Sequence, residues 1–195
     1  MAESTNPVIG FNKPETHSLE RKVARYKEVL DNTRQYRELW NASFKNALVE
    51  ALTRISKSAG IACSVEVRSE IQNLEAVVLS LGSQESGLGE PVGDNLFRPL
   101  IKQNGSLVYQ QLFNGKILVL INYPYIEKYG QPLPPKTIAI YRPEELKDPY
   151  CLRHLETFLN EITHWEDQDD ETPEVAHRIG FNVNLEDNNT NTPPA

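Results

Sequence analysis

Hydrophobic residues recur every three or four positions between residues 18 and 58, which is the repeat of one face of an α-helix. The stripe consists of Leu19, Val23, Tyr26, Val29, Leu30, Tyr36, Leu39, Trp40, Phe44, Ala47, Leu48, Ala51, Leu52 and Ile55. A single helix of this length would measure about 60 Å, whereas a compact domain of this size is about 40 Å across. The helix therefore either breaks at residues 31–33, where Asp-Asn-Thr can cap a second helix, or projects and packs its N-terminal half in a dimer. We favour the long helix, because no proline enforces a break.

Five segments after Gly60 have the composition of β-strands. They cover residues 61–68, 74–81, 107–113, 116–123 and 136–141. The short connections within the first two pairs predict antiparallel hairpins. A C-terminal helix is predicted over residues 148–165, because Asp148 can cap it and Pro149 suits its first position. Its apolar stripe consists of Cys151, Leu152, Leu155, Phe158, Leu159 and Ile162.

These elements predict an α+β fold with the order α-ββ-ββ-β-α. A long N-terminal helix precedes a five-stranded, mainly antiparallel sheet, and a C-terminal helix follows it. The length of 195 residues suits one domain, which we place at residues 17–165. The tails over residues 1–16 and 166–195 lack periodic patterns and are predicted to be mobile.

Asn114-Gly115 is the strongest local signal, because this pair favours a two-residue type I′ turn between strands. Such a turn would place Leu112 opposite Ile117 and Gln110 opposite Val119. Both faces of this hairpin would then be substantially apolar. Since the helices can cover only one face, the other needs cover from residues 83–105 or from a second subunit.

The net charge of −7 is concentrated at the C-terminal end. Residues 166–195 contain eight acidic side chains and one arginine, so residues 1–165 are neutral overall. This acidic tail argues against nucleic-acid binding and favours a basic partner. The chain has no apolar run long enough for a membrane span and no signal-peptide pattern at its N-terminus. We therefore expect a cytoplasmic protein that does not bind membranes, with Cys63 and Cys151 as reduced, buried thiols.

The glycine-rich segment 83–105 is predicted to be a mobile connection. Gly87, Gly89 and Gly93 loosely match a dinucleotide-binding loop, but no amphipathic helix follows them, and acidic residues occur within the segment. The segment is long for a loop, and its apolar residues must pack somewhere, as a lid or as an interface arm. Those residues are Leu96, Phe97, Leu100 and Ile101.

Candidate catalytic chemistry is sparse. Glu161 and His164 form a Glu-x-x-His pair, but a carboxylate-bridged metal site needs two such pairs and further glutamates. On a helix, His164 would point away from the apolar stripe and His154 would lie on its flank, so we expect both on a solvated surface. Neither cysteine has an obvious base partner in the sequence. We assign no catalytic, metal-binding or cofactor-binding residue and expect no cofactor.

Tyrosines and prolines dominate the connection at residues 122–135. Tyr123, Tyr125 and Tyr129 lie there beside four prolines. Tyrosine loses little entropy when it is fixed, and a proline-rich loop is already stiff. We therefore interpret the three tyrosines as candidate partner-binding residues.

The sequence Ile-Gly-Phe-Asn occurs at residues 9–12 and again at residues 179–182. In extended backbone, Ile9 and Phe11 project from the same side, and so do Ile179 and Phe181. Both copies could therefore add as an edge strand with two anchoring side chains. These four residues complete the candidate partner-binding set.

Together these features favour a non-catalytic protein-interaction module, adaptor or chaperone-like, that forms a homodimer and recruits a protein partner through its tails. One alternative is a small-molecule-binding domain or an enzyme with its site under residues 83–105. Another is a structural subunit of a larger protein assembly.

Overall fold

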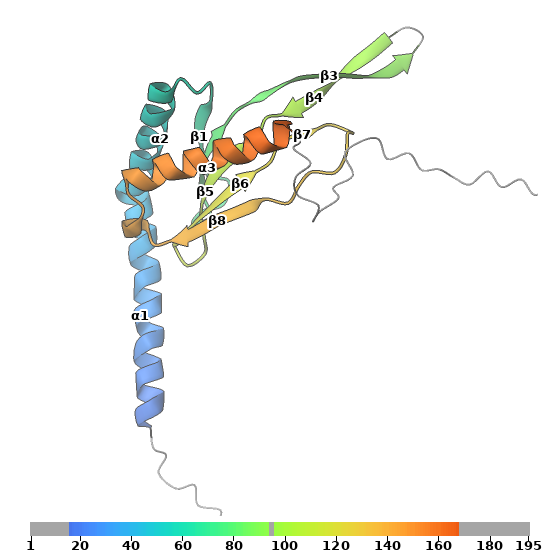
Figure 1. Ribbon diagram of the computed structural model, residues 1–195. Helices are drawn as coiled ribbons and strands as arrows, with labels where there is room; N and C mark the ends of the chain where they lie inside the picture. The colour runs from blue at the N-terminus through green and yellow to red at the C-terminus, as the bar shows by residue number, and fades with distance from the viewer. Residues whose placement is uncertain (1–15, 94–95, 168–195) are drawn as a thin grey trace, which may run out of the picture.

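The computed structural model describes residues 16–93 and 96–167 (Figure 1). It confirms the α+β fold, with an N-terminal helix, a mainly antiparallel sheet and a C-terminal helix. The helical elements are α1 (His17–Leu39), η1 (Trp40–Phe44), α2 (Lys45–Ala59), η2 (Pro143–Glu145) and α3 (Asp148–Asp167). The strands are β1 (Ser64–Arg68), β2 (Ala76–Ser80), β3 (Ser83–Gly93), β4 (Leu96–Gln103), β5 (Ser106–Gln111), β6 (Ile117–Asn122), β7 (Tyr125–Ile126) and β8 (Lys136–Tyr141).

Helices α1 and α2 form one continuous rod, joined by the π-helical turn η1 and ended by Gly60 in the left-handed conformation. No break occurs at residues 31–33. Side chains that face the body recur every four residues along the rod: Tyr36, Trp40, Leu48, Leu52 and Ser56 are buried, and Phe44 is partly buried. In a regular α-helix, a four-residue spacing drifts by about 40° at each step. The wider π turn takes up part of this drift, so that Trp40 and Leu48 enter the same core.

The main sheet has the strand order β1-β2-β5-β6-β8, and every neighbouring pair is antiparallel. Helices α2 and α3 cover one of its faces (Figure 1). Alternate residues of each strand point to that face, so the strands and both helices share one core. Its fully enclosed members are Trp40, Leu52, Val77, Leu79, Leu107, Tyr109, Ile117, Val119, Ile121 and Phe158.

The opposite face of the main sheet carries a smaller apolar cluster. Ala76, Val78 and Val108 are buried in it, and Leu120 is partly buried. Ile140, on the outer strand β8, is 55% exposed. This face of the sheet therefore also carries apolar side chains, as the sequence pattern predicted.

Strands β5 and β6 form the expected hairpin, but the predicted register is wrong by one residue. Gln111 faces Ile117, and Tyr109 faces Val119. The Gly115 N–H donates to the Leu112 carbonyl at 2.8 Å, and only Gly115 of the turn has a positive φ, of 76°. A type I′ turn needs positive φ at two residues, so this turn is instead a three-residue connection with a glycine bulge. The shift moves Tyr109 and Val119 onto the same face, toward the helices.

Residues 83–93 and 96–103 form strands and are not part of the loop that we predicted. Strands β3 and β4 pair antiparallel, and β4 pairs with β7, which gives a second sheet of order β3-β4-β7. We call this hairpin the β3–β4 arm; it projects from the body in a different direction from α1 (Figure 1). Register shifts between Glu85 and Gly89 and between Pro91 and Gly93 interrupt the pairing. Such bulges accommodate glycine and proline within an irregular strand pair. Because apolar and polar residues do not alternate regularly there, the sequence pattern did not indicate these strands.

Candidate functional site

The N-terminal half of α1 leaves the body of the protein and carries a stripe of exposed apolar side chains (Figure 1). Residues 16–31 are all exposed. The exposed fractions are 58% for Leu19, 42% for Val23, 64% for Tyr26 and 47% for Leu30. These residues are spaced by four, three and four positions, so they lie along one side of the helix. We call these four residues the α1 stripe.

Charged residues surround the α1 stripe. Arg25 and Glu28, on the other side of the helix, form an ion pair at 2.8 Å between Nη1 and Oε1. Glu20 and Lys27 follow Leu19 and Tyr26 directly and line one flank of the stripe. Thr16 donates a hydrogen bond from Oγ1 to Glu20 Oε1 at 2.7 Å, in the first turn of the helix. A short helix alone in water is only marginally stable, so an exposed apolar stripe on a charged helix favours a packing partner.

Glu75, just before β2, fastens the rod to the body where α1 meets α2. Its Oε2 accepts a hydrogen bond from Trp40 Nε1 at 2.8 Å and from Lys45 Nζ at 2.7 Å. The hydrogen bond from Lys45, followed by that from Trp40, lowers the pKa of the Glu75 carboxyl against the opposing effect of burial. The carboxylate therefore stays ionised and holds both sides of the π turn, so the direction in which α1 leaves the body is fixed.

The β5–β6 turn supports the rod from a second side. The Arg37 guanidinium donates to the Phe113 carbonyl. An added Cβ at Gly115 would lie 2.7 Å from the Tyr36 Cβ and 3.1 Å from the Thr33 carbonyl oxygen. Asn114-Gly115 therefore serves as both a turn and a close contact with the helix, a role that the sequence pattern did not reveal.

His154 is buried, contrary to our expectation of a solvated flank. It is 2% exposed and lies between two tyrosines, with Tyr109 Oη 3.1 Å from Nδ1 and Tyr141 Oη 3.1 Å from Nε2. Burial lowers the pKa of His154 to about 4. The imidazole is therefore neutral at pH 7, donating to one tyrosine and accepting from the other. His164 is exposed, as predicted.

The arrangement around His154 does not suit catalysis. Burial raises the pKa of the Tyr109 hydroxyl and of the Cys151 thiol. A thiol is a nucleophile only as the thiolate, so a buried thiol with a raised pKa is inert. Cys63, just before β1, is a partly buried free thiol. We interpret the His154 cluster as a polar element of the core, whose buried groups satisfy one another.

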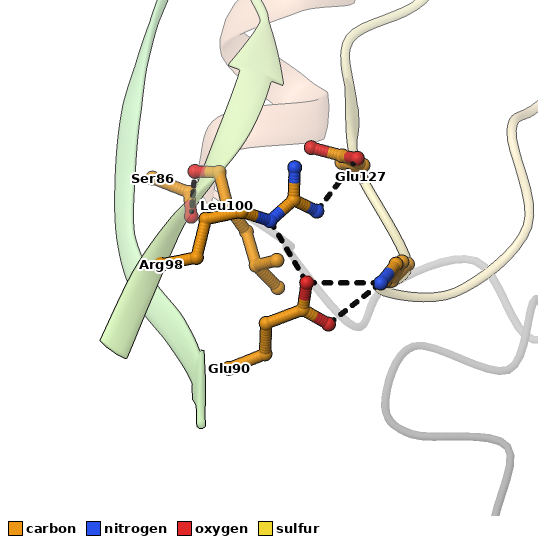
Figure 2. Close-up of polar contacts among 6 residues, drawn as sticks. Ser86, Glu90, Arg98, Leu100 and Glu127 are labelled. Carbon is orange, nitrogen blue, oxygen red and sulfur yellow. Dashed lines mark hydrogen bonds and ion pairs between the residues drawn. The ribbon is translucent and has the colours of Figure 1, made fainter. Parts of the chain in front are cut away.

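The outer part of the β3–β4 arm is held by an ionic network (Figure 2). Arg98 donates to Glu90 Oε1 at 2.8 Å and to Glu127 Oε1 at 2.9 Å. Lys128 also reaches Glu90, at 2.9 and 2.7 Å from its two carboxylate oxygens. The hydrogen bond from Lys128, and then that from Arg98, lowers the pKa of Glu90. The network ties β3 and β4 to the connection after β7.

The arm also exposes apolar side chains near its tip. Phe97 is 67% exposed, Leu96 63% and Val92 58%. At its base, Leu100 is buried, and Lys102 binds Glu166 with 2.5 Å to each carboxylate oxygen and lies 5.3 Å from the centre of the Trp165 ring. The arm is therefore anchored to the end of α3 and presents an apolar tip to solvent.

The three candidate tyrosines lie in different environments. Tyr123 Oη donates to Glu161 Oε2 at 2.5 Å, and burial together with this carboxylate raises the pKa of Tyr123. Tyr125 pairs with Gln103 and is 42% exposed. Tyr129 is partly buried, and its N–H donates to the Ile126 carbonyl at 3.1 Å. Of the three rings, Tyr125 is the most accessible to a partner.

The repeated Ile-Gly-Phe-Asn segments, with Ile9, Phe11, Ile179 and Phe181, lie outside the described residues, so their role stays a prediction. Within residues 16–93 and 96–167, no group of three or more His, Cys, Asp or Glu residues is arranged to hold a metal ion. The same residues include no helix with the length and hydropathy needed to cross a membrane. None of the family models, curated proteins or solved structures compared with the chain matches it.

Proposed function

We propose that this chain is a non-catalytic protein-interaction module that works as a homodimer, with the exposed half of α1 as its dimerisation element. The observation that carries this proposal is the α1 stripe. Four large, exposed side chains lie on one side of a helix whose N-terminal half projects away from the body of the protein. Burying such side chains contributes about 1.5–3 kcal/mol each relative to exposure, which is more than an isolated helix gains from its backbone alone.

The body of the protein supports the same proposal. Glu75 and the turn at Gly115 hold the rod at a fixed angle, so the exposed half of α1 is presented and does not fold back onto the sheet. The side chains of the described region that we considered for catalysis contribute to the core instead: His154 is neutral and enclosed, and Cys151 is buried. Recruitment of a further protein then falls to other surfaces, for which Tyr125, the apolar tip of the arm and the two Ile-Gly-Phe-Asn segments are candidates.

Light scattering coupled to size-exclusion chromatography tests the proposal. The wild-type chain should elute as a dimer at tens of micromolar, and replacing Val23 and Leu30 together by Glu should make it a monomer with an unchanged melting temperature of the body. The matched control replaces Ser18 and Gln35 by Glu, which adds the same charge away from the stripe and should leave the dimer intact.

Three results would overturn or redirect the proposal. A wild-type chain that elutes as a monomer would refute the proposed homodimer. A dimer that survives both stripe substitutions would place the interface elsewhere, for example on the sheet face that holds Val78 and Val108. A particle much larger than a dimer would favour the structural subunit of an assembly.

A further inference from the structure

We infer that the two α1 helices of the dimer pair antiparallel, with Leu19 facing Leu30 of the second copy and Val23 facing Tyr26 of the second copy. This inference rests on the proposed function and adds to it the partner segment, the direction and the register. It follows from three features of α1: the positions of the apolar residues, the length that is exposed, and the charges that flank the stripe.

The positions of the stripe residues are symmetric. An antiparallel pair of identical helices has a twofold axis perpendicular to both helices. The residue numbers of any two stripe residues that face each other across this axis therefore have the same sum. With the axis between Ala24 and Arg25, residue 19 faces residue 30 and residue 23 faces residue 26. All four stripe residues then meet apolar partners, and none is left against a charge.

The exposed length of α1 selects this register over its neighbours. The helix is exposed through Asp31, whereas Asn32 and Thr33 are partly buried against the body. With the axis between residues 24 and 25, His17 faces Asn32 of the second copy, so the overlap ends where the body begins. Increasing the overlap by one repeat, about seven residues, would bring His17 level with Leu39 of the second copy. The start of each helix would then collide with the body of the other chain. Sliding them one repeat the other way would bring Leu30 level with residue 12 of the second copy, ahead of the start of α1 at His17.

The flanking charges select the direction. Reversing one helix places the flank that carries Glu20 and Lys27 against the same flank of its copy. Glu20 then lies beside Lys27 of the second copy, twice by symmetry, which gives two attractive pairs. A parallel pair would instead place Lys22 beside Lys27 of the second copy, again twice, which gives two repulsive pairs. On the opposite flank of the antiparallel pair, the aliphatic stem of Lys22 covers Val29, which is 44% exposed in the single chain.

Replacing Lys27 by Glu distinguishes the antiparallel from the parallel pair, because it should weaken the first dimer and strengthen the second. In the antiparallel pair it turns two attractions into two repulsions, and the dimer dissociation constant should rise about tenfold at low salt. Adding Glu20→Lys to the same chain should restore the wild-type dissociation constant, because the pairs are then reversed. In a parallel pair, Lys27→Glu would tighten the dimer by creating an attraction to Lys22.

Disulfide trapping tests the register directly. A mixture of the Leu19→Cys chain and the Leu30→Cys chain, one of them enlarged by a fused tag, should form the mixed disulfide on mild oxidation. Neither chain alone should form a disulfide dimer beyond the level of the wild-type chain, which carries Cys63 and Cys151 as an internal control. In a parallel pair, each chain would link to its own copy.

The outcomes distinguish this inference from the proposed function. A wild-type monomer would remove both. A dimer that Lys27→Glu tightens, or that links Leu19→Cys to itself, would overturn the antiparallel register and leave the interaction module standing. Weakening by Lys27→Glu, restoration by Glu20→Lys and the mixed disulfide would establish the antiparallel pair.

Discussion

The hydroxyl of Tyr109 lies 3.1 Å from Nδ1 of His154, and both side chains are enclosed between β5 and α3. The burial of His154 makes the stability of the fold sensitive to mild acid. Burial lowers the pKa of His154 to about 4 in the folded state, whereas an unfolded histidine has its ordinary pKa of about 6.5. Between these values the unfolded chain binds one proton more than the folded chain, so the stabilisation is complete above pH 6.5 and is lost as the pH falls.

We therefore expect the free energy of unfolding to decrease by about 2 kcal/mol between pH 7 and pH 5. The carboxylates with lowered pKa, such as Glu75 and Glu161, titrate below this window and do not account for it. Urea titrations at several pH values would measure the slope. His154→Leu should abolish it, and His164→Ala, at an exposed position of the same helix, should retain it. An unchanged slope in the His154 variant would refute this assignment.

Gly115→Ala should destabilise the protein by at least about 2 kcal/mol, because it adds backbone strain and a clash with Tyr36 at 2.7 Å. Gly87 is the matched control: its φ is 78°, and an added Cβ would meet no atom within 4 Å. Gly87→Ala should therefore cost only the strain, about 1 kcal/mol. Thermal unfolding of both variants measures the difference, and equal costs would mean that the turn does not support the rod.

Glu75→Ala should lower the free energy of unfolding by about 2 kcal/mol, because Trp40 and Lys45 would both lose a partly buried, charged acceptor. Glu66, which pairs with Arg68 on the surface, is the control and should cost less than about 0.5 kcal/mol when replaced by Ala. Tryptophan fluorescence during denaturation would report the change at Trp40 as well as the global transition. A Glu75 variant as stable as the Glu66 variant would contradict the anchoring role.

Glu90→Gln should loosen the β3–β4 arm without unfolding the body. Glu90 accepts hydrogen bonds from both Arg98 and Lys128, and the uncharged amide holds these two cations more weakly. We expect amide hydrogen exchange in β4 to become several-fold faster while exchange in β5 and β6 stays the same. Glu85→Gln, on the same strand, is the control; equal exchange in both variants would mean that the network does not hold the arm.

The helices and the main sheet could be predicted because their signals are local. The long stripe from Leu19 to Ile55 and the strands around Asn114-Gly115 follow regular repeats, and these elements are present. The register of the hairpin could not be predicted, because a glycine suits both a type I′ turn and a three-residue turn with a glycine bulge. The same limit applies to His154: its partners lie 45 and 13 positions away on two strands, and no local pattern pairs them.

The β3–β4 arm was missed for a different reason. The backbone hydrogen bonds that pair two strands form with almost any side chains. A strand that contains Gly87, Gly89 and Gly93 therefore pairs in the structure without showing the alternation of apolar and polar residues that predicts a strand. The α1 stripe, in contrast, was visible as a periodic pattern, but only the fold shows which part of that pattern is buried. Tyr36 and Trp40 are enclosed, whereas Leu19 to Leu30 are exposed.

The π turn at Trp40–Phe44 has a consequence for how such a protein can change during evolution. Each residue added to or removed from a helix rotates everything beyond it by about 100° and moves it by about 1.5 Å. Deleting a single residue from this turn would restore an ordinary helical repeat and rotate the whole N-terminal half of the rod by roughly a quarter of a circle, which would also turn Tyr36 and Trp40 away from their buried positions. Such a deletion would therefore need compensating changes around Trp40, because the core itself fixes the direction in which the outward-facing side chains point.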